Sequence, residues 1–172
     1  MEEYPIPTHL KSIIKVNEAL SDETNIDGKI ICHCGCEVFK IMQNEGREYD
    51  ELLPYSEQDG LKIIANCKDC GRNLLLFDEA TQGFNGFVCH DYKTANDESL
   101  TVLRCKKCGA VDFSVVIGIE VEDKEQFIEE CVNEAPDEFS PDDFADAFNW
   151  ITVTVHCAAC GNTDEWISLE LS

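Results

Sequence analysis

Hydrophobic residues in this chain occur in short blocks, several of which alternate with polar residues at the period of two that half-buried β-strands show. The clearest block spans residues 111–121, where the alternating apolar positions are Val111, Phe113, Val115, Ile117, Ile119 and Val121. A second long block at 149–155 is rich in β-branched residues, and shorter apolar blocks lie at 29–31, 38–41, 61–65, 74–77, 100–103 and 166–171. The pattern predicts a mainly β, α+β fold with antiparallel sheets and short helices.

The N-terminal segment predicts a helix instead of a strand. Thr8 can cap a helix that runs to about Leu20. Its apolar stripe would consist of Leu10, Ile13, Ile14, Asn17 and Leu20, of which only Asn17 is polar. We expect this helix to cover one side of a small sheet.

A long acidic excursion, residues 120–148, separates the two long strand blocks and is called here the acidic insertion. It contains twelve Asp and Glu against one Lys, a net charge of −11. Residues 123–133 predict a helix whose inward side holds Phe127, Ile128 and Cys131.

The end of the acidic insertion predicts a further short helix. Ser140 and Pro141 are the residue types that favour a helix cap and the first helical position. Phe144 and Phe148 are four residues apart, so they would lie on one face of this helix.

Four short cysteine turns punctuate the strand blocks. Three of them contain two cysteines separated by two residues and followed directly by glycine, at 67–71, 105–109 and 157–161. Two such turns can present four thiolates to one tetrahedral divalent metal ion. The two turns in the second half of the chain predict one site, with ligands Cys105, Cys108, Cys157 and Cys160.

The fourth turn is ambiguous because Cys32, Cys34 and Cys36 crowd five positions. An internal repeat guides the assignment: when Cys34-Gly35 is aligned with Cys108-Gly109, Phe39 also falls on Phe113. The predicted ligands of the other site are therefore Cys32, Cys34, Cys67 and Cys70. An alternative set uses Cys36 in place of Cys32, since thiols two residues apart can reach one metal in either pairing.

Composition and charge reduce the number of function classes that the chain can belong to. The 172 residues include 11 cysteines and have a formal net charge of −22. Such an acidic surface disfavours nucleic-acid binding, which depends on Lys and Arg neutralising phosphates. No apolar run approaches the ~20 residues of a membrane span, and the first residues lack the features of a secretory signal. We therefore expect a cytoplasmic protein whose cysteines bind metal instead of forming disulfides.

The four cysteine turns and their flanking strands, over roughly residues 29–171, resemble two tandem copies of the zinc-ribbon family. The resemblance implies one small antiparallel sheet per copy and two structural Zn²⁺ ions. It divides the chain into an N-terminal extension with a helix (1–28), a first ribbon (29–84), a connection (85–99) and a second ribbon (100–172) that carries the acidic insertion.

Three functional hypotheses follow from this reading. Four thiolates close the coordination shell of a metal, so hydrolytic chemistry is not expected and we expect a non-enzymatic protein. The favoured hypothesis is a protein-binding module or adaptor whose acidic insertion docks a basic protein, with Phe127, Phe144 or Phe148 as candidate anchors. An alternative of the same class is an acidic immunity-type inhibitor of a basic partner. The enzyme alternative is a redox protein that holds iron as in rubredoxin or cycles cysteine pairs as dithiols. The charge could also serve solubility alone.

Overall fold

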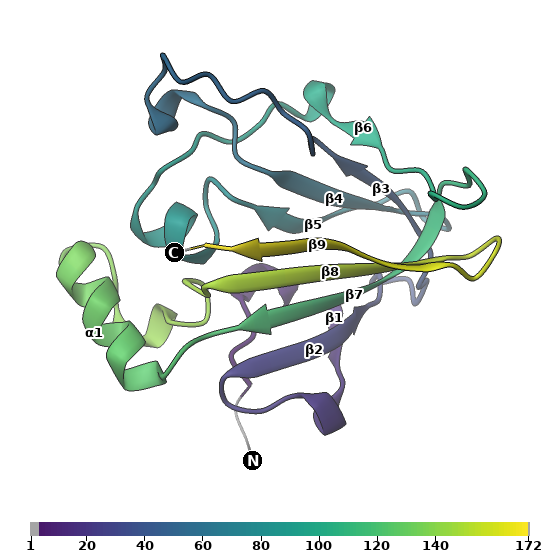
Figure 1. Ribbon diagram of the computed structural model, residues 1–172. Helices are drawn as coiled ribbons and strands as arrows, with labels where there is room; N and C mark the ends of the chain where they lie inside the picture. Colours follow the sequence, from purple (N-terminus) through teal and green to yellow (C-terminus); the bar gives the residue numbers. More distant parts are fainter. Residues whose placement is uncertain (1–3, 172) are drawn as a thin grey trace.

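The computed structural model describes residues 4–171 and is dominated by one nine-stranded antiparallel sheet (Figure 1). In chain order its strands are β1 (Ile14–Val16), β2 (Asn25–Ile30), β3 (Phe39–Gln43), β4 (Lys62–Cys67), β5 (Asn73–Asp78), β6 (Thr101–Val102), β7 (Asp112–Glu120), β8 (Trp150–Cys157) and β9 (Thr163–Glu170). The α-helix among the described residues is α1 (Lys124–Glu134). The predicted mainly β, antiparallel fold class with short helices is confirmed.

Short helical turns connect the strands. They lie at Thr8–Leu10, Glu18–Leu20, Tyr55–Glu57, Asp97–Ser99 and Pro141–Asp143, with a π-helical turn at Phe84–Val88. No helix in the part of the chain described here combines the length and the apolar character that a membrane span requires.

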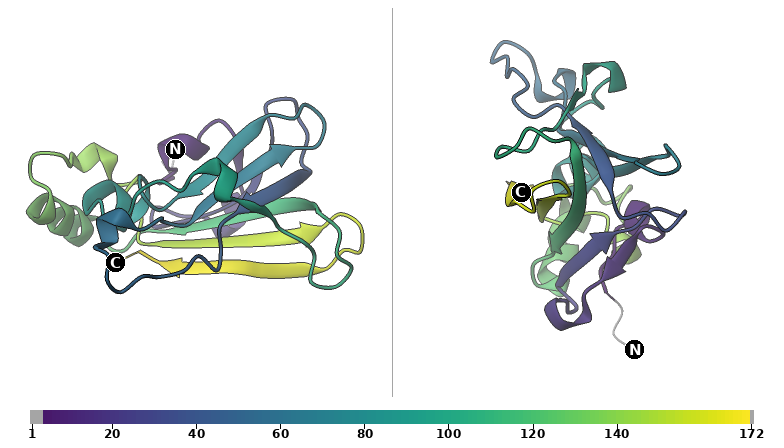
Figure 2. Two further views of the ribbon diagram at one scale, coloured as in Figure 1. Left: turned by 90° about the horizontal axis from the view of Figure 1, so that it is seen from above. Right: turned by 90° about the vertical axis from the view of Figure 1, so that its right-hand side faces the viewer.

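The sheet consists of two leaves that meet at one short strand pair. One leaf has the order β6-β3-β4-β5, and the other has the order β1-β2-β7-β8-β9. They join where β3 pairs with β7, with Phe39 opposite Phe113 and Lys40 opposite Asp112. The two leaves curl around a shared interior (Figure 2).

Each leaf includes a strand from the other half of the chain. β2, which precedes the first cysteine turn, pairs with β7 from the second half of the chain and places Lys29 opposite Val116. β6, which precedes the third turn, pairs with β3 in return and places Val102 opposite Met42. Lys29 and Val102 each lie three residues before the first cysteine of their turn. The exchange is therefore reciprocal, as in a two-fold arrangement centred on the Phe39–Phe113 pair.

A shared irregularity supports this internal repeat. The β4–β5 register shifts between Ile63 and Ile64, and the β8–β9 register shifts between Val153 and Thr154. Both shifts begin four residues before the first cysteine of the following turn. A bulge bends and twists the strand that carries it, so the two leaves have the same local shape.

One hydrophobic core fills the space inside the curled sheet. Alternate residues of β7 point inward, as the alternation of the sequence predicts, and Phe113, Val115, Ile117 and Ile119 are each at most 2% exposed. Phe39 and Ile41 of β3 are completely buried in the same cluster. The two leaves thus share one core. The division of the chain into residues 1–28, 29–84, 85–99 and 100–172 stays a prediction.

The predicted N-terminal helix is wrong. Residues Thr8–Leu10 form a 3-10 turn, and the chain then extends into β1, where Ile14 lies opposite Ile30 of β2. The β-branched side chains of Ile14 and Val16 suit a strand at the edge of the sheet. Leu20, the last residue of the predicted stripe, is 64% exposed. Pairing of this segment with the edge strand β2 is therefore favoured over the helix that its apolar spacing predicts.

The acidic insertion packs its aromatic residues inward. Phe127 and Cys131 on the inner side of α1 are buried, as predicted, and Phe148 is completely buried against Phe77, with ring centroids 6.1 Å apart. The second predicted helix is a single 3-10 turn, with Pro141 in its first position. At the start of the π-helical turn, the Phe84 ring centroid lies 6.0 Å from that of Phe127.

Candidate metal centres

Each cysteine turn is shaped by the glycine that follows its second or middle cysteine. Gly35, Gly71, Gly109 and Gly161 have φ angles between +72° and +90°, a region that side chains other than glycine rarely adopt. Hydrogen bonds close each turn, for example from Gly109 N–H to the Cys105 carbonyl at 2.9 Å and from Cys105 N–H to the Ala110 carbonyl at 2.8 Å. The sequence therefore determines the direction in which the thiols point.

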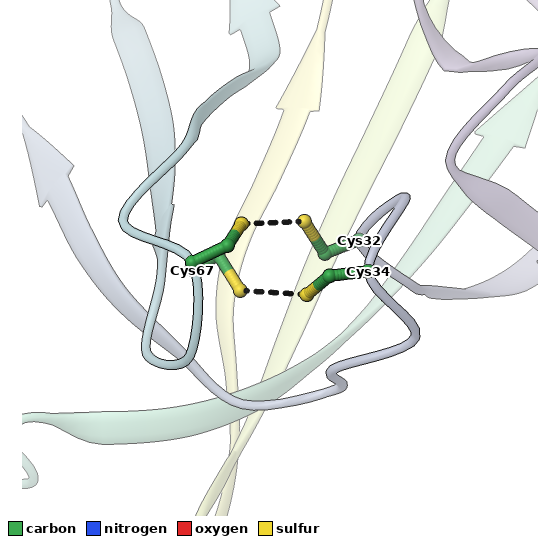
Figure 3. A group of neighbouring side chains, drawn as sticks. Cys32, Cys34 and Cys67 are labelled. Atoms are coloured by element: carbon green, nitrogen blue, oxygen red, sulfur yellow. Dashed lines mark hydrogen bonds between the residues drawn. The ribbon is translucent and has the colours of Figure 1, made fainter.

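The structure brings the eight predicted ligands together in two groups, Cys32 with Cys34, Cys67 and Cys70, and Cys105 with Cys108, Cys157 and Cys160. Figure 3 shows Cys32 and Cys34 on one turn facing Cys67 on the opposite turn. All sulfur atoms of one group lie within 4.8 Å of one another. Both groups lie at the right-hand end of the molecule in Figure 1.

The sulfur spacing fits a tetrahedral metal ion. Across the turns, the sulfur atoms of Cys32 and Cys70 and those of Cys34 and Cys67 are each 3.5 Å apart. The matching distances in the other group are 3.7 Å and 3.6 Å. A Zn–S bond of ~2.3 Å in a regular tetrahedron requires sulfur atoms about 3.8 Å apart. Each group could therefore hold one metal ion with little rearrangement.

Backbone donors favour the thiolate form at some of the ligands, and the crowded thiols oppose it at others. The N–H groups of Cys108 and Lys107 lower the pKa of Cys105 to about 6, and those of Cys70 and Asp69 lower the pKa of Cys67 to about 6. At Cys34 and Cys108 a backbone donor is outweighed by the neighbouring thiols and by desolvation, which raise the pKa of each to about 12. The first cysteine of each of these turns is buried, whereas Cys70 and Cys108 are exposed. Each site thus has one side at the surface, open to metal and to chelators.

A matching backbone bond locks the two turns of each site together. Lys68 N–H donates to the Val38 carbonyl at 3.0 Å, and Ala158 N–H donates to the Asp112 carbonyl at 2.9 Å. Each bond joins the second turn of a site to the strand that leaves the first turn. The two sites therefore share their supporting contacts as well as their ligand pattern.

Cys36 lies outside the first group. It is half-buried, and its thiol lies 3.4 Å from the Val38 carbonyl oxygen. All eleven cysteines are free thiols. His156, the neighbour of Cys157, directs Nδ1 to the Thr163 hydroxyl at 2.8 Å.

Replacing Cys36 by Ser is expected to leave two bound metal ions, whereas Cys34→Ser is expected to leave one. The reason is that only Cys34 contributes a sulfur atom to the first group. Native mass spectrometry of the two variants measures the metal count directly. The alternative ligand set with Cys36 would be supported by the loss of an ion from the Cys36 variant.

Comparison of the chain with known family models, with curated proteins and with solved structures finds no match. The interpretation of the two sites therefore rests on their own geometry. Four sulfur atoms around one ion leave no position for water or substrate, and this arrangement is typical of sites that stabilise a fold.

Sequence reasoning missed a group of three tyrosines whose rings contact one another, Tyr49, Tyr55 and Tyr92. Tyr49 and Tyr55 come from the excursion between β3 and β4, and Tyr92 comes from the connection between the two halves of the chain. The available signal was the presence of four large apolar residues in an otherwise acidic loop, Tyr49, Leu52, Leu53 and Tyr55.

Proposed function

We propose that the protein is a non-enzymatic protein-binding module, stabilised by two structural Zn²⁺ ions, whose acidic insertion docks a basic protein. The assignment of zinc rests on the donor set, because four thiolates in a tetrahedron favour zinc or iron among the common metals. A closed thiolate shell supplies no open position for catalysis, which supports a structural role.

The exposure of the acidic insertion carries the proposed binding function. Ten of its twelve acidic residues are exposed: Glu120, Glu122, Asp123, Glu125, Glu129, Glu130, Glu134, Asp137, Glu138 and Asp142. Within the described part of the chain, the basic side chain that contacts a carboxylate of the insertion is His90, whose Nε2 lies 2.7 Å from Glu138. The remaining carboxylates keep their charge available to steer a basic partner toward this surface.

The phenylalanines of the insertion do not serve as anchors for this partner. Phe127 and Phe148 are 2% and 0% exposed, so both rings belong to the core. Phe144 is half-buried, and the Lys124 ammonium lies 4.4 Å from its ring centroid. Binding through the insertion is therefore electrostatic, and it should weaken steeply as salt is added.

A charge-neutralised variant tests this proposal better than a deletion, because removing the insertion would also remove its buried core residues. Glu125→Gln, Glu129→Gln and Glu134→Gln neutralise exposed positions of α1 without changing side-chain size. The matched control neutralises three exposed acids elsewhere, Glu18, Glu23 and Glu165.

In affinity capture from native lysate at low salt, the wild-type and control proteins are expected to retain the same basic proteins. The α1 variant is expected to lose them, and added salt should release them from all baits. Equal capture by all three proteins, or no specific capture by any of them, would contradict docking by the insertion.

A further inference from the structure

Four of the five exposed large apolar side chains in the described chain gather in one loop, residues 45–57, called here the tyrosine loop. Tyr49 is 58% exposed, Leu52 92%, Leu53 42% and Tyr55 53%. Isolated exposed apolar residues need no explanation, but a contiguous group is typical of an interaction site. The loop lies in the first leaf at the position that the acidic insertion occupies in the second, between the strand after one cysteine turn and the strand before the next.

The rings of this loop are held in place by one another. The centroids of Tyr49 and Tyr55 are 5.9 Å apart at an interplanar angle of 40°, and those of Tyr55 and Tyr92 are 5.9 Å apart in an edge-on arrangement at 72°. Such spacings are favourable for aromatic pairs. Tyr92 is half-buried, so it links the exposed rings to the body of the protein.

Polar contacts below the rings fix the backbone of the loop. Arg47 donates to the Asp59 carbonyl at 2.9 Å and forms an ion pair with Glu79 at 2.8 Å, where the Glu79 side chain is 4% exposed. The buried Gln58 accepts from Asp50 N–H at 3.1 Å and donates to the Leu53 carbonyl at 3.2 Å. The loop is thus organised before any partner binds, which lowers the entropic cost of binding.

The charge of the surface indicates which partner it fits. Residues 44–60 hold six carboxylates and one arginine, a net charge of −5. Four of these acids, Glu48, Asp50, Glu51 and Glu57, are exposed and form no ion pair with any residue that the structure describes. The single arginine is paired with buried Glu79, so it does not neutralise them. Exposed aromatic faces among unpaired carboxylates are complementary to a cation with a flat, weakly hydrated surface, which describes the arginine guanidinium.

We propose that the tyrosine loop binds an arginine-containing basic segment of the partner protein. Guanidinium groups stack on Tyr49 and Tyr55, the neighbouring carboxylates pair with them, and Leu52 and Leu53 contact the aliphatic parts of the segment. This inference rests on the proposed function, because it supplies the apolar anchor that the acidic insertion lacks.

The two surfaces are placed to contact one partner. In Figure 1 the tyrosine loop and α1 both lie at the left-hand end of the molecule, opposite the cysteine turns, with the end of β9 between them. A basic protein steered by the insertion would therefore meet the loop on the same end of the molecule. The electrostatic and the stacking contacts have different signatures, so they can be measured separately.

The test uses the zinc-loaded protein of residues 1–172 and two capped synthetic peptides, one of alternating Arg and Gly and one of alternating Lys and Gly. The peptides have equal length and charge. They differ in the charged group, which is a planar guanidinium able to stack on tyrosine in one and a compact ammonium in the other. Wild-type protein is expected to bind the Arg peptide about tenfold more tightly than the Lys peptide. In amide NMR spectra, the Arg peptide should shift the signals of residues 49–55.

The double variant Tyr49→Ala, Tyr55→Ala is expected to lose this preference for arginine while its affinity for the Lys peptide changes little. The control is Leu20→Ala, which removes a side chain of similar exposure (64%) on a different segment and should keep the preference. Circular dichroism confirms that the variants stay folded, as expected because the substituted side chains are exposed.

Binding of the Arg peptide with equal affinity to the wild-type and tyrosine variants, with shifts confined to residues 122–147, would overturn the role of the tyrosine loop. That result would leave the proposed docking by the insertion standing. Failure of both peptides to bind the wild-type protein at low salt would overturn the loop as a site for basic segments, and would also count against the proposed function.

Discussion

Removing the metal ions with a strong chelator is expected to unfold the protein, and adding Zn²⁺ back is expected to restore the fold. Structural Zn²⁺ contributes on the order of 10–16 kcal/mol in zinc-finger peptides, whereas the whole net stability of a domain is about 5–15 kcal/mol. Loss of even one ion is therefore comparable to the entire stability. Without metal, four sulfur atoms only 3.5–3.7 Å apart across the turns have no partner that holds them together.

Far-ultraviolet circular dichroism and amide NMR dispersion measure this transition. The control is the same chelator saturated with Mg²⁺, which should leave the spectra unchanged. Metal analysis of the native protein is expected to find two zinc ions per chain and a colourless solution, since thiolate-bound iron is coloured. A chelated protein that keeps a dispersed spectrum would show that the shared core holds the sheet without metal.

The metal sites were predictable from the sequence because their determinants are local. In three turns a glycine directly follows the second of two cysteines that are separated by two residues. Gly71, Gly109 and Gly161 all have the positive φ that such a tight turn requires. The fit of the less regular turn at Cys32 and Cys34 followed from its alignment with Cys108. The structure pairs Phe39 with Phe113, the two residues that this alignment superposes.

The contacts between the two halves could not be predicted from these patterns. Alternation shows that β2 and β6 are strands, but it carries no information about which edge they join. Each strand joins the leaf that is built mainly from the other half of the chain, because β3 and β7 each have an edge only partly occupied by the short Phe39–Phe113 junction. The N-terminal helix was wrong for a related reason, since Ile14 gains a strand partner that the helical period does not reveal.

The phenylalanines of the acidic insertion show how composition can mislead about surfaces. Phe127 and Phe148 stand in a highly charged segment, which favoured their interpretation as exposed anchors. Both rings instead fill the end of the core, where Phe148 meets Phe77 and Phe127 meets Phe84. A segment with a net charge of −11 stays attached to the sheet because these apolar side chains are buried.

The strand exchange predicts that neither half of the chain folds alone, even with zinc present. A chain of residues 1–99 retains all four ligands of its own site but loses β7, the partner of β2. A chain of residues 100–172 likewise retains its ligands but loses β3, the partner of β6. Each half would also expose one side of the shared core, including Phe39 in the first and Phe113 in the second. Burying a large aromatic side chain contributes about 3–5 kcal/mol, as judged from truncation to alanine.

Separately purified halves are expected to give poorly dispersed NMR spectra with zinc, and an equimolar mixture is expected to recover the native spectrum and two metal ions. The control is the intact chain with a protease site placed in the exposed turn Asp97–Ser99 and cleaved after folding. The cleaved protein should stay folded and elute as one species, because the cut breaks only the connection and leaves both exchanged strands paired. Independent folding of the second half would show instead that each ribbon is a domain of its own, as the division at residues 85–99 predicts. In that case the β2–β7 and β6–β3 pairs would be contacts between domains, and they would contribute little to the stability of either one.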